Sequence, residues 1–269
     1  MEAELKSIIR YCSVLFSMGT MMVSSCQEIE ADDSTQVKPV VQGYIASGHT
    51  VEVDVKTQLL FASADTSVAV SGLHLLLSVD GKQYPLTQFD TVYRSPVVVQ
   101  EGKVYTLEFD YNGKTISSTT TIPEPPSGFT ASDSLLVITP FNSQGFGFPV
   151  FPNPITLTWN NPDESNYLIV VKNIETNPAA INAGATRRFF VFRSNPVQNN
   201  TFDIRAMQFQ YYGRHHIILY KINGEYAELY QNNGTSSLNI KTPYSNVTNG
   251  LGIFTGINAD TLMVRVKPR

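Results

Sequence analysis

The sequence predicts a mostly β protein with two antiparallel β-sandwich domains, of which the second carries one short helix. Three observations predict this fold. Apolar and polar residues alternate with strand period over most of the chain, and turn residues recur at intervals of about 8 to 12 residues. Pro123, Pro125 and Pro126 then interrupt the pattern. We therefore expect the first domain at residues 37–126 and the second at residues 127–269.

A targeting segment precedes the first domain. Lys6 and Arg10 form a basic start, residues 11–23 are apolar, and two serines precede Cys26. This order is typical of a bacterial lipoprotein signal peptide, in which the cysteine is acylated and becomes the new N-terminus. We expect residues 1–25 to be cleaved and Cys26 to be the lipid attachment site. The apolar run is shorter than the roughly 20 residues of a spanning helix, so the lipid is the expected membrane anchor.

Acidic residues on both sides of this segment leave alternatives open. Glu2 and Glu4 are unusual in a basic start, and a misplaced start codon or an uncleaved membrane segment would also account for them. Residues 26–36 form an acidic tether. Its acids resemble the export signal that brings Bacteroidota lipoproteins to the outer face of the outer membrane, and a solvated spacer is the other interpretation.

The first domain is built from alternating segments and tight turns. Asp80-Gly81 predicts a type I′ hairpin because both residues accept a positive φ, and Asn112-Gly113 predicts a second turn. The prolines that end the domain cannot donate to a strand ladder. Strands are expected at residues 40–44, 51–56, 73–79, 84–86, 97–99, 104–111 and 115–122.

The second domain continues the strand pattern around one tryptophan. Ile155, Leu157 and Trp159 alternate inward, and with residues 167–171 they resemble the tryptophan-bearing strands of fibronectin type III and other Ig-like sandwiches. Trp159 is therefore expected in the core. Further strands are expected at residues 135–138, 188–193, 202–210, 214–222, 251–256 and 261–266.

Two other segments of this domain stand out. Residues 140–154 form a Gly/Pro/Phe-rich loop, whose Phe146, Phe148 and Phe151 either cover a sandwich edge or form an exposed contact surface. A helix is expected near residues 224–232, where Glu225 favours the first turn and aromatic residues share one face. A helix of about eight residues is too short to be stable alone, so it must pack on the sandwich.

Composition limits the chemistry of the mature chain. The formal net charge is −4, and the charges within the signal segment cancel, so no basic excess remains to bind nucleic acid. Cys12 and Cys26 lie in the signal or at its cleavage point, so no free thiol remains for a disulfide, a metal or a nucleophile. An apolar fraction of 42% is enough to build ordinary cores.

We predict no catalytic residue, no metal site and no cofactor, and hence not an enzyme. His215 and His216 are adjacent on a predicted strand and point to opposite faces, and the remaining histidines, His49 and His74, lie in the other domain. Common motifs of metalloproteases, serine hydrolases and phosphate-binding loops do not occur. The acidic pair Asp163-Glu164 lies at a turn, where solvation and turn chemistry explain it.

Two stretches resemble a known family. Residues 37–126, with 40–45 and 105–126 as their signatures, are similar to the N-terminal half of the Bacteroidota lipoproteins called domain of unknown function 4249 (DUF4249). Residues 219–256 are similar to the C-terminal half. The second stretch ends in Asn249-Gly250-Leu251-Gly252-Ile253-Phe254. The resemblance carries no catalytic motif. It implies an outer-membrane lipoprotein, often encoded beside TonB-dependent transporters.

Three short triplets also resemble the O-glycosylation sequence of Bacteroidota envelope proteins, with ordinary turn chemistry as the alternative. They are Asp90-Thr91-Val92, Asp133-Ser134-Leu135 and Asp260-Thr261-Leu262.

These observations predict a lipid-anchored outer-membrane protein that binds rather than catalyses. The expected partners are the membrane, through Cys26, and a protein, either a TonB-dependent transporter or an envelope complex, on either face of the outer membrane. A surface glycan-binding module is the alternative, because 13 tyrosines and 15 phenylalanines could supply a stacking platform. A hydrolase is the third class, and it lacks a motif.

Overall fold

The computed structural model describes residues 37–58, 68–138, 152–182, 189–231 and 244–269. Lys38–Arg269 form one compact unit. Cys26, the predicted signal peptide and the acidic tether lie outside the described residues. The same holds for Phe146, Phe148 and Phe151 of the aromatic loop.

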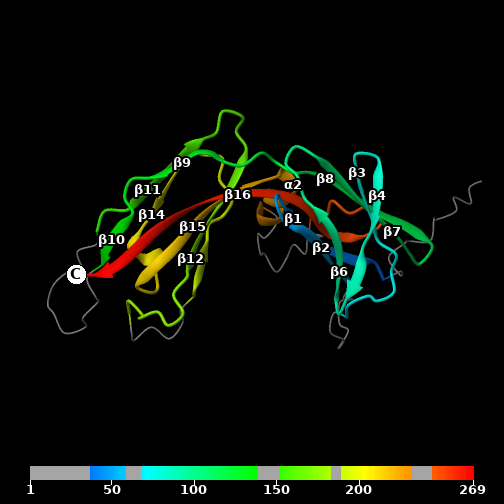
Figure 1. Cartoon of the computed structure of the whole chain (residues 1–269), viewed down its shortest axis with the longest axis horizontal. Helices are drawn as coiled ribbons and strands as arrows, with labels where there is room; N and C mark the ends of the chain where they lie inside the picture. Colours follow the sequence, from blue (N-terminus) through cyan, green and yellow to red (C-terminus); the bar gives the residue numbers. More distant parts are fainter. Residues whose placement is uncertain (1–36, 59–67, 139–151, 183–188, 232–243) are drawn as a thin grey trace, which may run out of the picture. The chain divides into compact units, whose positions relative to one another are not determined.

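Within the described residues, the strands form three sheets (Figure 1). The largest has nine strands in the order β13-β12-β15-β16-β1-β2-β6-β5, with β10 pairing with β16 beside this path. Its strands are β1 (Pro39–Ala46), β2 (Thr50–Thr57), β5 (Thr87–Phe89), β6 (Val92–Val98), β10 (Leu135–Ile138), β12 (Asn166–Asn173), β13 (Val191–Arg193), β15 (Gly213–Ile222) and β16 (Leu251–Pro268).

Two smaller sheets and two helical segments complete the described structure. The three-stranded sheet has the order β14-β11-β9 and the four-stranded sheet the order β4-β3-β7-β8. Their strands are β3 (Leu76–Val79), β4 (Lys82–Pro85), β7 (Val104–Tyr111), β8 (Lys114–Thr121), β9 (Ser127–Ala131), β11 (Ile155–Asn160) and β14 (Thr201–Ile204). The helical segments are the 3-10 turn η2 (Ala206–Gln208) and the α-helix α2 (Gly224–Gln231).

Two hydrophobic clusters show that each smaller sheet faces part of the large one. The first lies between β1, β2 and β6 on one side and β3, β7 and β8 on the other, and Phe254 of β16 belongs to it. The second lies between β9, β11 and β14 on one side and β12, β15 and β16 on the other, and Val264 and Val266 of β16 belong to it. The predicted fold class, a mostly β protein made of sandwiches with one short helix, is confirmed.

Local turn signals agree with the structure. Asp80 has a φ of 51° and Gly81 a φ of 73°, as the predicted hairpin requires, and Asn112-Gly113 shows the same pattern with 50° and 78°. The helix begins at Gly224 as expected. Trp159 is 3% exposed within the second cluster, so its predicted place in the core is confirmed.

Other segments differ from the sequence prediction. The two predicted closing strands are a single strand, β16, of 18 residues, because Gly256 continues the extended backbone. The strand predicted at 202–210 ends at Ile204, and η2 follows it. β6 begins five residues before the predicted Val97 and contains Pro96, which sits beyond the part of β6 that pairs with β5. The sequence pattern predicts neither β5 nor β9, which comes directly after the prolines.

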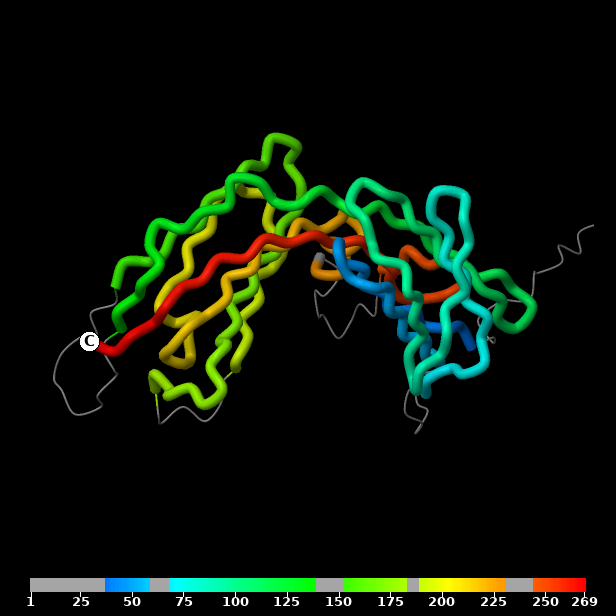
Figure 2. The backbone as a smooth tube through the Cα atoms, viewed as in Figure 1, coloured from blue at the N-terminus to red at the C-terminus, as the bar shows by residue number. Residues whose placement is uncertain are grey.

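Two of the described strand pairs are parallel, although the sequence predicts antiparallel sandwiches throughout. β16 runs parallel to β1 over Leu251–Ile257 and parallel to β10 over Arg265–Pro268, and it is antiparallel to β15 along most of its length. Figure 2 follows β16, in red, from the C-terminus past β15 toward β1 in blue. A single strand thus contributes side chains to both clusters.

The start of β16 depends on a very close backbone approach. A Cβ atom on Gly252 would lie 2.0 Å from the carbonyl oxygen of Val41, and the φ of Gly252 is +101°. Asn246 holds the backbone of Phe254 in place. Its Nδ2 donates to the Phe254 carbonyl oxygen (2.8 Å), and its Oδ1 accepts from the Phe254 N–H (3.0 Å). Phe254 is thereby placed in the first cluster with no exposed surface.

No helix in the described ranges is long and apolar enough to cross a bilayer.

The close approach at Gly252 predicts a large loss of stability for Gly252→Ala. A non-glycine residue at positive φ costs about 1–2 kcal/mol, and here the methyl group also displaces β1, so we expect a total loss of at least about 3 kcal/mol in urea unfolding. Gly48→Ala is the matched control. Gly48 has a φ of +77° with nothing within 4 Å of its added Cβ, so only the backbone cost of about 1–2 kcal/mol applies. Equal losses in the two variants would contradict this explanation.

Candidate functional site

The large sheet has a strand that is apolar on both faces. β12 buries five consecutive residues, Tyr167 to Val171. Tyr167, Ile169 and Val171 point into the second cluster. Leu168 and Val170, which alternate with them, belong instead to a third cluster on the opposite face. This outer face therefore needs a cover of its own, unlike the polar outer face of an ordinary antiparallel sandwich.

Helix α2 covers one end of the outer face. Ala227 is buried there against the sheet, with Ile222 in the same cluster. The Tyr226 ring meets Tyr44 of β1 edge to face at 5.3 Å and Tyr230 at 5.8 Å between ring centroids. Burial raises the pKa of the Tyr226 phenol well above its ordinary value, with a smaller contribution from its hydrogen bond to Tyr230. The phenol is thus neutral at physiological pH.

A polar network fixes the start of α2. Oε1 of Glu225 accepts hydrogen bonds from Thr120 Oγ1 (2.9 Å), Thr255 Oγ1 (3.1 Å) and Asn223 Nδ2 (3.1 Å). Thr120 Oγ1 in turn accepts the Gly256 N–H at 2.9 Å. Because the helix is too short to be stable alone, this network and its apolar face hold it on the sheet.

Beside α2, the outer face is hollowed into a groove with a volume of ≈ 510 Å³. Nine of its twelve described lining residues are apolar or aromatic, namely six aliphatic side chains from the sheet and three tyrosines. The lining residues are Gln42, Tyr44, Leu168, Val170, Lys172, Val191, Arg193, Ile218, Tyr220, Ile222, Tyr226 and Ile257. They come from six elements, β1, β12, β13, β15, β16 and α2, and we take this groove as the candidate functional site.

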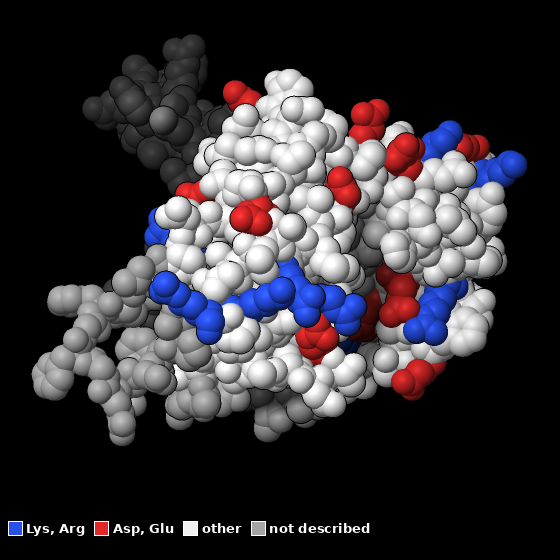
Figure 3. Space-filling model, turned by 60° about the vertical axis from the view of Figure 1, so that its left-hand side comes forward, with Lys and Arg blue, Asp and Glu red and all other residues white. Residues whose placement is uncertain are grey.

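The charge of the groove is one-sided. Lys172 and Arg193 line it, and no carboxylate from the described part of the chain does. The ladder places Lys172 opposite Val191, and Arg193 opposite Val170, so both cations stand beside aliphatic neighbours. Neither belongs to an ion pair with any residue that the structure describes. More broadly, Figure 3 shows a row of Lys and Arg side chains on one face of the molecule, whereas acidic side chains are scattered.

Most of this chain matches the model of one protein family. The model of the family described as Domain of unknown function (DUF4249) matches residues 26–262. The chain belongs to this family. The resemblance predicted from the sequence is therefore confirmed at the level of the family, while the bacterial group and the lipid anchor stay predictions.

Two further comparisons add little to the DUF4249 assignment. No curated protein matches the chain. Among solved structures, domains A168–A170 of titin are 10% identical, with a TM-score of 0.22, and the match covers 86% of this chain and 67% of that one. The fibronectin(III)-like modules of Clostridium thermocellum CbhA are 11% identical, with a TM-score of 0.25 and coverages of 85% and 95%. With scores this low, we draw no conclusion from either likeness.

The glycines of the DUF4249 chain near residue 252 have a structural role. The Cβ of a residue at 252 or 256 would lie within 2.5 Å of a carbonyl oxygen of β1 or β8. Asn249 Nδ2 donates to the Thr115 carbonyl oxygen at 2.9 Å. The Asn/Gly/Phe segment, which is one of the stretches that carry the family resemblance, is therefore a packing motif of β16 outside the groove lining. Other residues of those stretches, Tyr44, Tyr220 and Tyr226, do line the groove.

The two adjacent histidines of this DUF4249 protein do face opposite sides of β15. His215 is buried beside Phe209, and its Nε2 and Nδ1 contact Asn173 Nδ2 (3.1 Å) and the Gly213 carbonyl oxygen (3.2 Å). Desolvation lowers the pKa of His215 to about 4, so it is neutral: Nδ1–H donates to the carbonyl and Nε2 accepts from the amide. His216 lies on the other face, and the pair does not converge.

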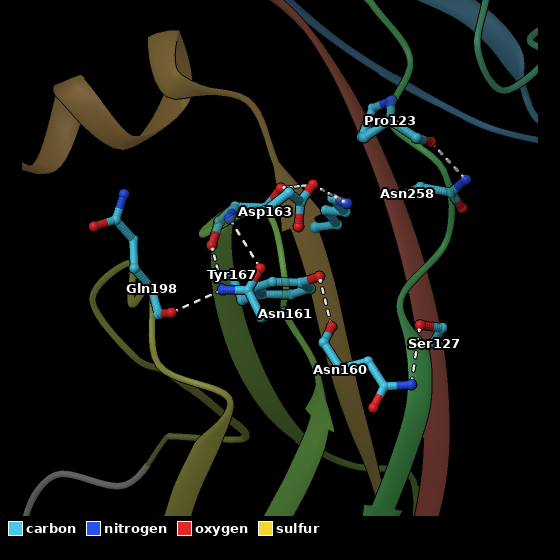
Figure 4. Close-up of polar contacts among 10 residues, drawn as sticks. Pro123, Ser127, Asn160, Asn161, Asp163, Tyr167, Gln198 and Asn258 are labelled. Atoms are coloured by element: carbon cyan, nitrogen blue, oxygen red, sulfur yellow. Dashed lines mark hydrogen bonds and ion pairs between the residues drawn. The ribbon is translucent and has the colours of Figure 1, made fainter.

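The remaining predicted residues are placed at turns. Asp163 Oδ2 accepts from Ser165 Oγ at 2.7 Å and pairs with Lys221 Nζ at 3.1 Å (Figure 4). These contacts, the first above all, lower the pKa of Asp163. Asn161 ties the same turn to the Gln198 carbonyl oxygen at 2.7 Å. The acid is thus a turn residue, as its position in the sequence predicts.

The three glycosylation-like triplets lie in the described residues. Thr91, Ser134 and Thr261 are all exposed. Asp133 Oδ1 accepts the N–H of Leu135, which is ordinary turn chemistry. Asp260 Oδ1 accepts the N–H of Thr261, but both residues lie within β16. Modification of these residues stays a prediction.

A metal site is not found among the described residues. No three of their His, Cys, Asp and Glu side chains lie close enough to hold a metal ion. The motifs in the sequence do not predict the groove. The signal that could have indicated it is the unbroken apolar run of β12. A strand that is continuously apolar in sequence is buried on both faces.

The buried, neutral His215 predicts a stability that decreases in acid. Its folded pKa of about 4 lies below the ordinary 6.5, so its contribution is complete above pH 6.5 and is lost as the pH falls from 6.5 to 4. Since one pH unit corresponds to about 1.4 kcal/mol, the loss is about 3 kcal/mol. Urea unfolding of the wild type and of His215→Leu, compared at pH 7.5 and pH 4, should show a difference that shrinks by this amount. A difference independent of pH would contradict the assignment.

Proposed function

We propose that this protein is a lipid-anchored, non-catalytic binding module of the outer membrane, accessory to a TonB-dependent transporter or an envelope assembly. The observation that supports binding is the groove beside α2. It is concave, its floor is apolar, and its two charged side chains lack an ion-pair partner among the described residues. These are the properties of a ligand site rather than of a catalytic one, which needs convergent titratable groups.

Membership of the DUF4249 family supports the envelope location through the resemblance to outer-membrane lipoproteins. The predicted lipid attachment site, Cys26, is the first residue of the matched region. An N-terminal cysteine that carries acyl chains would hold the whole of Lys38–Arg269 at a membrane surface.

A glycan-binding surface needs exposed, coplanar aromatic rings. Among the described residues, Phe190 stacks on Tyr211 at 4.6 Å between ring centroids, so each ring covers one face of the other. In the groove, Tyr44 and Tyr226 meet edge to face. These aromatic contacts therefore do not favour the glycan-binding alternative.

If Cys26 carries the lipid anchor, the Cys26→Ala variant should no longer be found in the membrane fraction. Because stable anchoring of a protein needs about two acyl chains, loss of the acylated cysteine should move the protein from the membrane pellet to the soluble fraction. Immunoblots of fractionated cells measure this, with Cys12→Ala as the matched control that should stay in the membrane. Retention of the Cys26→Ala variant in the membrane would contradict the lipoprotein assignment.

The accessory role predicts a stoichiometric partner. A C-terminal tag, extraction of outer membranes in mild detergent and mass spectrometry should recover a transporter or assembly component at a ratio near one to one. An unrelated lipoprotein with the same tag serves as the control for detergent micelles. A solitary protein after extraction would overturn the accessory role and leave direct ligand capture as the function.

A further inference from the structure

We infer that the groove binds a single-chain amphiphile with an anionic head group, the tail on the sheet and the head at Lys172 and Arg193. The inference rests on the proposed function in so far as the groove is a binding site. It does not require the protein partner, and it names the chemical class of the captured ligand.

The size of the groove favours a small molecule. Its ≈ 510 Å³ falls in the range of about 300–1,000 Å³ that is typical of ligand sites. A stable protein interface involves about 20–30 residues on each side, whereas the lining of this groove is much smaller. Along β12 the floor runs from Lys172 to the row of Ile222 and Ile257, six residues away, which corresponds to about 20 Å. The site is therefore long, as the binding of an extended hydrocarbon tail requires.

The floor favours an acyl chain over a peptide. Ile218 and Val191 present partly exposed aliphatic surface, whereas Leu168, Val170 and Ile222 of the same lining are at most 6% exposed. The backbone groups of β12 and β15 are already used in the ladders of β12, β15 and β16. A peptide laid on this floor would leave its own N–H and C=O groups without partners there, and such groups are costly to desolvate. A hydrocarbon tail carries no such groups, and its burial is favourable in proportion to its length.

The charges favour an anionic head. Lys172 lies at one end of the floor. Arg193 lies opposite Val170, which is two residues from Lys172 along β12 and nearer the centre of the floor. Both line a surface without a carboxylate. A carboxylate or phosphate head would form charge-assisted hydrogen bonds with them. A cationic head would be repelled, so the groove discriminates between amphiphiles by the sign of their charge.

Titration with matched amphiphiles tests the inference. The Cys26→Ala variant is used because it carries no acyl chain of its own and needs no detergent, and dodecanoate is added below its critical micelle concentration. Calorimetry should show one site per chain. Dodecyltrimethylammonium, with the same tail and the opposite charge, should bind at least about tenfold more weakly. Octanoate, four methylene groups shorter, should also bind at least about tenfold more weakly.

Three variants place the site. Lys172→Gln with Arg193→Gln should weaken dodecanoate binding about three- to tenfold, whereas Lys82→Gln, an exposed lysine on β4 outside the groove, should leave it unchanged. Ile218 is only partly buried, so Ile218→Trp should fill the groove and abolish binding with the fold intact by near-ultraviolet circular dichroism.

Several outcomes would overturn the inference. These are no binding of dodecanoate, equal binding of the cationic amphiphile, or unchanged binding to the folded Ile218→Trp variant. Each is distinct from failure of the accessory role, which appears only as the loss of a co-purified partner. If the protein binds dodecanoate but co-purifies with nothing, the inference about the groove ligand stands and the accessory role at a transporter is overturned.

Discussion

The contact on which the rest of the structure depends is the approach of β16 to β1 at Gly252. The carbonyl oxygen of Val41 occupies the place where any other residue would have its Cβ. This approach sets the parallel register of the two strands, and the register puts Phe254 into the first cluster. Further along the same strand, Val264 and Val266 enter the second cluster. One strand, positioned at one glycine, thus takes part in both cores.

Local signals in the sequence predict most of the elements, and non-local contacts explain the misses. The Asp80-Gly81 turn, the core position of Trp159 and the helix from Gly224 follow from residues within a few positions of each other. The sequence predicts two strands in place of β16 because Gly256 resembles a turn signal. This glycine is instead required by the Thr121 carbonyl oxygen, 135 positions earlier in the chain, and nothing near residue 256 reveals that neighbour.

The groove could not be predicted from the sequence for a similar reason. Its lining comes from six elements, and the strand order that brings β1, β12 and β13 near α2 is a property of the finished sheet. One clue is local. The run from Tyr167 to Val171 lacks the alternation of the other strands, which indicates burial on both faces and hence a third layer over the sandwich. α2 supplies part of that layer, and its Tyr226 also lines the groove.

Lys172 and Arg193 have no ion-pair partner among the described residues, and this is not the result of a shortage of acids. The chain has 23 Asp and Glu against 19 Lys and Arg. Elsewhere in the described residues, acids do meet cations, as Glu52 meets Arg94 and Glu175 meets Arg214. Arg214 lies on the same sheet as the groove, and it holds the pKa of Glu175 down to about 2. An acid within reach of Lys172 or Arg193 would neutralise the end of the apolar floor, and an anionic ligand would then have no charge to recognise.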